Sequence, residues 1–183
     1  MAETATAQRR TSLETRGFDA KGASLTLAPS SFRVSLRAPE ASISVLEEAL
    51  GLSLPRLPKT SSEEGTRAAL WLGPDEWLVI DTETDPLTAS RGVEALHSAV
   101  DISHRNVGIV ASGAYAAEAV NGGCPQDLSP EAFPVGACSR TVLGKIEIVL
   151  WKKAENSFHI ECWRSFSPYA FAFLTASARD AAA

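Results

Sequence analysis

Cysteine is scarce in this sequence, long apolar runs are missing, and positive charge is not in excess. The three cysteines, Cys124, Cys138 and Cys162, are an odd number in 183 residues, which argues against a disulfide framework. No apolar run approaches the roughly 18 residues that an ordinary transmembrane helix requires. The N-terminus lacks the apolar core of a signal peptide, and Glu3 and Glu14 are unusual for a transit peptide. These absences predict a cytoplasmic protein with no membrane association.

The charge balance and several missing motifs exclude further classes of protein. Lys and Arg number 17 against 22 Asp and Glu, a net charge of −5, so a nucleic-acid partner is not expected. Neither a phosphate-binding Gly-x-x-x-x-Gly-Lys-Ser/Thr motif, nor Gly-x-Gly-x-x-Gly, nor Gly-x-Ser-x-Gly occurs. No cysteine pair has Cys-x-x-Cys spacing, and odd spacing in a strand puts His159 and Cys162 on opposite faces. We expect no metal site, with Cys162 facing the core and His159 facing outward.

The sequence contains the same order of elements twice. Each half reads as a strand, a helix, a Pro-rich loop, a hairpin and a second helix, and helical stripes such as Ile43, Leu46 and Leu50 before Gly51 support the pattern. The predicted elements are strands over 32–37, 107–111 and within 138–163, a hairpin over 68–80, and helices over 40–50, 91–99, 114–120 and 166–179.

This repeat predicts an α+β fold of two related βαββα units packed together, the split βαβ arrangement of ferredoxin-like folds. We assign residues 24–99 to the N-terminal unit and 100–183 to the C-terminal unit. Because two helices cover only one face of each sheet, the other faces should pack together or against a partner. Residues 1–23 have little periodic hydrophobicity and are expected to form a disordered tail, or alternatively an arm that orders on a partner.

The segment 101–105 is the densest polar cluster of the sequence. Asp101, Ser103, His104 and Arg105 place an acid, a hydroxyl, an imidazole and a guanidinium within five residues. One interpretation makes Asp101 or His104 an acid–base group and Arg105 an anion clamp. The other is a linker between the halves, in which the Asp and Ser side chains hydrogen-bond the local backbone.

The second candidate segment, 163–167, joins a predicted strand to the last helix. Ser165 or Ser167 is a plausible N-cap, because Pro168 then falls in the first helical turn. Arg164 is placed to bind an anion or to pair with an acid across an interface. The sequence thus lacks a self-contained active site, which favours a binding or assembly module over an enzyme.

Several motifs in one collinear order resemble a known family, the γ subunit of heterotetrameric sarcosine oxidase. The resemblance extends over roughly residues 25–178 and leaves the N-terminal tail outside it. The motifs that carry it are Trp71–Leu78, Val100–Arg105, Gly123–Pro130, Phe133–Gly136, Ser139–Trp151 and Trp163–Phe166.

The resemblance implies a noncatalytic subunit of an enzyme that oxidatively demethylates sarcosine to glycine and passes the one-carbon unit to tetrahydrofolate. In that family NAD belongs to the α subunit, FAD to the β subunit, FMN to the junction of α and β, and zinc to the δ subunit. The resemblance therefore implies no cofactor on this chain and makes the α, β and δ subunits its partners, chiefly α. A homodimer of the isolated chain is a further possibility. The residues that we expect at the interface are Asp101, His104, Arg105, Trp163, Arg164 and Phe166.

An alternative function follows from a second resemblance. The stretch from Asp101 to Leu128 is similar to the opening segment of the folate-binding aminomethyltransferase (glycine-cleavage T-protein) family, to which the γ subunit fold is also related. Only a fragment of that pattern is present. The alternative is a small folate-binding accessory protein, and titration with tetrahydrofolate separates the two.

Overall fold

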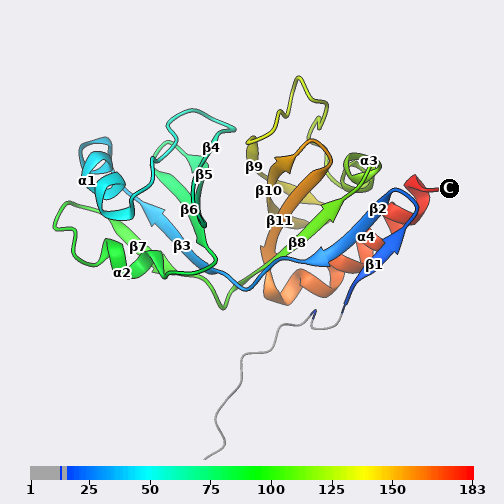
Figure 1. Ribbon diagram of the computed structural model, residues 1–183, viewed down its shortest axis with the longest axis horizontal. Coiled ribbons are helices and arrows are strands. Elements are labelled where there is room, and N and C mark those ends of the chain that lie inside the picture. The colour runs from blue at the N-terminus through cyan, green and yellow to red at the C-terminus, as the bar shows by residue number, and fades with distance from the viewer. Residues whose placement is uncertain (1–12, 14–15) are drawn as a thin grey trace, which may run out of the picture.

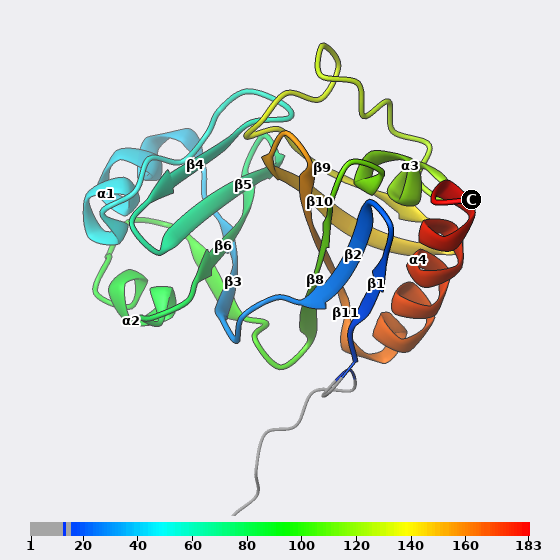
Figure 2. The same ribbon diagram turned by 45° about the vertical axis from the view of Figure 1, so that its right-hand side comes forward.

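The computed structural model describes Leu13 and residues 16–183 of the chain. Two antiparallel β-sheets lie face to face, and each carries helices on the side away from the other sheet (Figures 1 and 2). This arrangement confirms the predicted α+β class and the packing of two units against each other. Residues 1–12, 14 and 15 of the expected tail lie outside the described residues.

The first sheet has five strands with two helices on one face. Its elements are β3 (Phe32–Arg37), α1 (Glu40–Leu50), β4 (Ser61–Glu64), β5 (Arg67–Gly73), β6 (Glu76–Asp81), α2 (Pro86–Ser90) and β7 (Ser98–Asp101). The strand order is β4-β5-β6-β3-β7. Val34 and Leu36 of β3 pack in one apolar cluster with Ile43 and Leu46 of α1. As predicted, α1 ends at Gly51, whose φ of 61° is the left-handed conformation of a helix C-cap.

The second sheet has six strands and is covered by the C-terminal helix. Its elements are β1 (Phe18–Ala20), β2 (Ala23–Leu27), β8 (Asn106–Ser112), α3 (Ala116–Asn121), β9 (Cys138–Leu143), β10 (Ile146–Ala154), β11 (Ser157–Trp163), the 3₁₀ turn η1 (Arg164–Phe166) and α4 (Ser167–Ala181). The strand order is β1-β2-β8-β11-β10-β9. Leu174 of α4 packs with Ile109, Leu150 and Ile160 of the sheet. No helix in the described part of the chain is long and apolar enough to cross a membrane.

The two sheets have equivalent strand orders, which confirms the predicted repeat. In the first sheet β5, β6, β3 and β7 lie side by side, and in the second β10, β11, β8 and β2 occupy the same positions. In the N-terminal unit, the last of these strands is β7, which follows α2 in the sequence. The C-terminal unit ends with α4, and β2 from the start of the chain fills the corresponding position by pairing antiparallel with β8. The N-terminal segment therefore crosses from one sheet to the other (Figure 1).

This crossing corrects the predicted boundaries of the tail and the units. Residues 18–20, assigned to the tail, form β1 and pair with β2, and Leu13 is fully buried in the core of the second sheet. The division between 99 and 100 cuts through β7, which pairs with β3. Strand β1 escaped prediction because its three residues are too few for a periodic pattern. Residues 25–27 read as a short strand from the sequence, but the pairing of β2 with the distant β8 is not reported by local periodicity.

The helix predicted over 91–99 is also wrong. The helix lies earlier, at α2, because the Asp85 side chain caps it by accepting a hydrogen bond from Leu87 N–H at 2.9 Å, with Pro86 in the first turn. Residues 98–101 are instead strand β7. The predicted Pro-rich loop after α1 likewise contains a strand, β4, which pairs with β5 at the sheet edge.

An apolar core joins the two sheets. Trp151 Nε1–H donates to Ser61 Oγ at 3.0 Å, and Ser61 Oγ–H donates to the Gly136 carbonyl at 2.6 Å, so polar contacts also cross the junction. Each sheet is thus buried on both faces. The buried apolar residues at this junction are Ala68, Leu70, Leu78, Ile80, Cys138, Val149 and Trp151.

Candidate functional site

The two polar segments singled out in the sequence lie next to each other in the fold. Strands β8 and β11 are neighbours, and Asn106 at the start of β8 lies opposite Trp163 at the end of β11. Just beyond this pair, Arg164 N–H donates to the Arg105 carbonyl at 2.7 Å. Residues 101–105 and 163–166, more than fifty positions apart, therefore form one surface.

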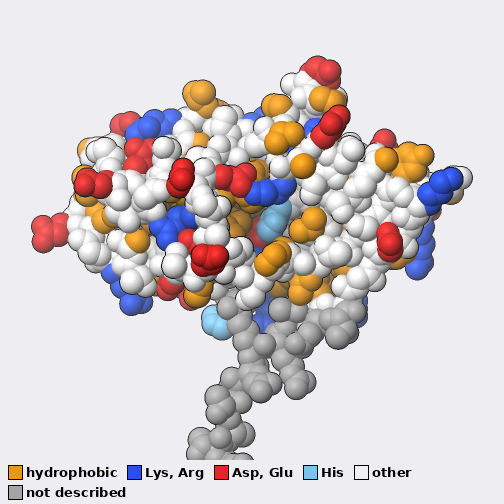
Figure 3. All heavy atoms as spheres, in the orientation of Figure 1, with side chains coloured by type: hydrophobic (Ala, Val, Ile, Leu, Met, Phe, Trp, Pro, Cys, Tyr) orange, Lys and Arg blue, Asp and Glu red, His pale blue; other side chains and the backbone are white. Residues whose placement is uncertain are grey.

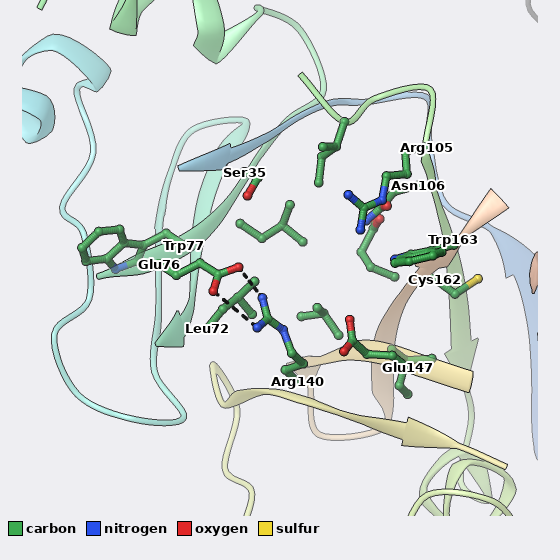
Figure 4. Close-up of a pocket in the computed structure, with 15 residues that line it drawn as sticks. Ser35, Leu72, Glu76, Trp77, Arg105, Asn106, Arg140, Glu147, Cys162 and Trp163 are labelled. Carbon is green, nitrogen blue, oxygen red and sulfur yellow. Dashed lines mark hydrogen bonds and ion pairs between the residues drawn. The ribbon is translucent and has the colours of Figure 1, made fainter. Parts of the chain in front are cut away.

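Three side chains form a continuous stack on this surface. The Arg105 guanidinium lies 4.4 Å from the centroid of the Trp163 ring, and the rings of Trp163 and Phe166 are stacked at 5.9 Å with an interplanar angle of 15°. Trp163 and Phe166 are each 41% exposed. Figure 4 shows Arg105 and Trp163 side by side. We call these three residues the arginine–aromatic stack.

The turn after β11 fixes the position of the stack. Trp163 ends the strand, η1 follows, and Pro168 lies in the first turn of α4. The predicted serine N-cap is wrong, because Phe166 occupies the cap position and no side chain caps the helix there. Ser167 Oγ–H instead donates back to the Arg164 carbonyl at 2.8 Å, which closes the turn.

Asp101 and Ser103 hold the backbone that leads to Arg105. Asp101 Oδ1 accepts a hydrogen bond from Ser103 N–H at 2.8 Å, and the buried Ser103 Oγ accepts one from Arg33 N–H at 2.9 Å. The Asp101 bond to the nearby backbone is the kind that the linker interpretation predicts, whereas Ser103 bonds the backbone of β3, 70 residues earlier. His104 lies between them and Arg105 with its side chain exposed.

Arg105 and Trp163 separate two hollows of different kinds. On the outside, an open groove of about 630 Å³ is lined by Arg105, Trp163, Arg164, Ser165 and Pro168. On the inside, the same two residues line a cavity of about 80 Å³ between the sheets. A cavity for a drug-sized ligand measures about 300–1,000 Å³, so the inner cavity is too small for one.

A buried ion cluster lies between the sheets. Arg33 of β3 donates to the two Glu161 oxygens of β11 at 2.7 and 2.9 Å, and Glu161 Oε1 is 2.7 Å from His159 Nε2. Burial alone would raise the pKa of Glu161, but the hydrogen bond to His159 and the charge of Arg33 outweigh it and hold that pKa at about 2. The cluster ties the two units together through a fully ionised carboxylate.

The backbone beside this cluster requires a glycine. A Cβ at Gly108 of β8 would lie 2.7 Å from Ala28 Cβ and 2.8 Å from both His159 Nε2 and Glu161 Oε1. Those distances are too short for any side chain. Gly108 therefore leaves the space that the ion cluster occupies.

Exposed ion pairs connect the sheets at the mouth of the inner cavity. Glu76 of β6 binds Arg140 of β9 and also accepts from Arg37 Nη2 at 2.9 Å, as Figure 4 shows for Glu76 and Arg140. Burial favours a raised pKa for Glu76, but the two arginines outweigh it and the pKa is lowered. In Figure 3, charged and histidine side chains occupy the hollow between the two halves, among hydrophobic ones.

The remaining reactive groups offer little chemistry. Within the described ranges, no group of three or more His, Cys, Asp or Glu side chains is placed to hold a metal ion. Burial raises the pKa of the Cys138 and Cys162 thiols to about 12, so both are protonated and unreactive near neutral pH. Among the described residues, the distinctive feature of this surface is therefore the arginine–aromatic stack beside its groove.

Sequence reasoning placed Cys162 correctly in the core but missed the ion cluster. The alternation in β11 predicts that His159 faces outward, yet it is 9% exposed, because the first sheet covers the face to which it points. The signal was present: Arg33 and Glu161 are charged residues inside predicted strands, and the open sheet faces were expected to need cover.

Comparison with known proteins agrees with the fold. The model of a family described as "Sarcosine oxidase, gamma subunit family" matches residues 19–181. Sarcosine oxidase subunit gamma of Corynebacterium sp. (strain P-1) is 38% identical over 130 residues, which are 68% of this chain and 63% of that protein. The Arthrobacter sp. subunit is 36% identical over 121 residues, 63% of this chain and 59% of that protein. The chain spans about three fifths of the length of the curated relatives it matches.

Two solved structures are similar. A chain of heterotetrameric sarcosine oxidase from Corynebacterium sp. U-96, in complex with pyrrole 2-carboxylate, aligns with a TM-score of 0.87 and 26% identity over 96% of this chain and 97% of that chain. Glycine cleavage system aminomethyltransferase T from Bartonella henselae aligns with a TM-score of 0.61 and 12% identity over 88% of this chain and 49% of that one, which shows a shared fold alone. Because the family match runs through nearly all of the described residues, the chain belongs to the sarcosine oxidase gamma subunit family.

Proposed function

We propose that this chain is the noncatalytic γ subunit of a heterotetrameric sarcosine oxidase. The observation that carries the proposal is the alignment with a chain of the Corynebacterium enzyme, which includes 96% of this chain and 97% of the other at a TM-score of 0.87. Its reaction would be the demethylation of sarcosine to glycine, with the one-carbon unit passed to tetrahydrofolate.

The interior of the chain supports a noncatalytic role. The space between the sheets is occupied by an apolar core and by the Arg33–Glu161 pair, and the cavity that remains is about 80 Å³. A flavin, a dinucleotide or a folate needs several times that volume. We propose that this chain holds no cofactor, and that FAD, FMN, NAD and zinc belong to the α, β and δ subunits, as the family resemblance implies.

The proposed role is to cover surface on the α subunit and hold it in the assembly. The experiment is co-expression of the tagged chain with the α, β and δ subunits of the same organism, followed by purification on the tag. We expect all four chains in one complex with sarcosine-oxidising activity. An αβδ complex that assembles and works fully without this chain would contradict the role.

A further inference from the structure

We propose that the arginine–aromatic stack is the docking surface of this chain for a partner-subunit segment that carries a carboxylate beside an apolar side chain. The proposal rests on the proposed function, because it names the part of the chain that the oxidase contacts. Arg105, Trp163 and Phe166 are the residues that carry it.

The stack presents more aromatic surface than a solitary subunit needs. Trp163 and Phe166 are both 41% exposed and stacked against each other, and Trp163 also lines the open groove of about 630 Å³. Trp and Arg are enriched among the residues that dominate binding energy at interfaces. The end of β11 and the closed turn after it fix the backbone of this segment, and the ring contacts restrict the side chains, so less side-chain freedom is lost on binding.

The charge of the groove determines the chemistry of its partner. Among the described residues that line it, Arg105 and Arg164 are cationic and none is acidic, although the chain as a whole has a net charge of −5. Arg164 has an interaction of its own, so Arg105 is the residue that determines the partner's chemistry. The Arg105 guanidinium rests on Trp163, and no carboxylate of the described residues pairs with it. A stacked guanidinium keeps its N–H donors available for a carboxylate at its edge. Two arginines are too few for a nucleic-acid surface, which leaves a protein carboxylate as the complement.

The test is recovery of the α, β and δ subunits by tagged variants of the full chain after co-expression. Arg105→Glu reverses the charge, Arg105→Lys keeps it, and Trp163→Ala removes the ring on which Arg105 rests. We expect Arg105→Glu and Trp163→Ala to lower recovery of the partner subunits roughly tenfold or more, as at interface hot spots. Arg105→Lys should retain most of the recovery.

Two exposed residues outside the stack serve as controls. Arg91→Glu makes the same charge reversal at the end of α2, and Leu96→Ala removes an apolar side chain that is 77% exposed. Both should recover the partner subunits as the wild type does. Thermal unfolding followed by circular dichroism identifies any variant that fails to fold, and if Trp163→Ala is one, the two Arg105 variants decide the outcome.

Three results would overturn the proposal. Undiminished recovery by Arg105→Glu would remove the stack from the interface while leaving the proposed function intact. A loss with Arg105→Lys as large as with Arg105→Glu would exclude the carboxylate. If Arg105→Glu breaks a homodimer of the isolated chain and leaves recovery unchanged, the occupant is a second copy. Failure of the wild type to recover any subunit would instead contradict the proposed function itself.

Discussion

At the scale of single residues, the Arg33–Glu161 pair does most to define how the two sheets meet. Both side chains are almost completely buried, at 4% and 0% exposure, and the pair forms two hydrogen bonds between β3 and β11. Arg33 also donates to the Ser31 carbonyl at 3.0 Å, and Glu161 is hydrogen-bonded to His159. The hydrogen-bonding groups of this buried pair are satisfied only when β3 and β11 are aligned as they are here. Any other alignment would leave a buried charge without a partner.

Glu161→Gln should destabilise the chain by about 3–5 kcal/mol. The amide is nearly the same size as the carboxylate, so the loss comes from the uncompensated charge of Arg33 and not from a cavity. The free energy of unfolding from urea titration measures it. Glu64→Gln, at an exposed position on β4, is the matched control and should change that free energy by less than about 0.5 kcal/mol. A change below 1 kcal/mol in Glu161→Gln would contradict the prediction.

Acid should weaken the fold through the same carboxylate. The pKa of Glu161 is about 2 in the folded chain, below the ordinary glutamate value of 4.5. Its ionised form therefore stabilises the fold above about pH 4.5, and this contribution is lost as the pH falls toward 2. Asp81 contributes stability over the same pH range. Its burial would raise its pKa, but backbone hydrogen bonds from Glu83 and Thr84 outweigh the burial and hold the pKa at about 2. The unfolding free energy of Glu161→Gln should fall less steeply between pH 5 and 2 than that of the wild type, and parallel curves would contradict the assignment.

At the scale of elements, local sequence predicted the parts whose signals are local. Strand β3 and helix α1 have the predicted bounds, because alternation in one and a Leu/Ile stripe ended by Gly51 in the other are complete within each segment. The position of β2 could not be predicted this way, because it is determined by pairing with β8 about eighty residues later. The arginine–aromatic stack was predictable in part. The sequence indicates both of its segments as candidates, but only the register between β8 and β11 brings the two segments together.

Leu25→Ala tests the crossing of the N-terminal segment. Leu25 of β2 is fully buried in the core of the second sheet, with Val120, Ile109 and Leu174 in the same cluster. Its truncation should cost about 2–5 kcal/mol, because a cavity opens beneath the strand that completes the C-terminal unit. Leu57→Ala, at a side chain 69% exposed, should cost less than about 0.5 kcal/mol in the same denaturant titration. Equal stability of the two variants would mean that β2 does not contribute to the core in solution.

At the scale of the whole molecule, the two related units form a closed sandwich and not an open cleft. The inner faces of the sheets are joined by an apolar core, a buried ion cluster and the Glu76–Arg140 pair at the edge. What the units leave outside is the arginine–aromatic stack and its groove. A molecule whose interior is filled and whose exposed stack lies beside a groove has a surface that another chain can recognise, and this supports the proposed assembly role.

The same architecture predicts that the isolated chain does not bind tetrahydrofolate, despite sharing a fold with aminomethyltransferase T. The inner cavity of about 80 Å³ cannot accept a folate, and widening it would separate Arg33 from Glu161. Isothermal titration of the purified chain with tetrahydrofolate should therefore give no saturable heat. A glycine-cleavage aminomethyltransferase titrated under the same conditions is the positive control. One-to-one binding with a micromolar Kd would contradict this prediction and support the alternative of a folate-binding accessory protein.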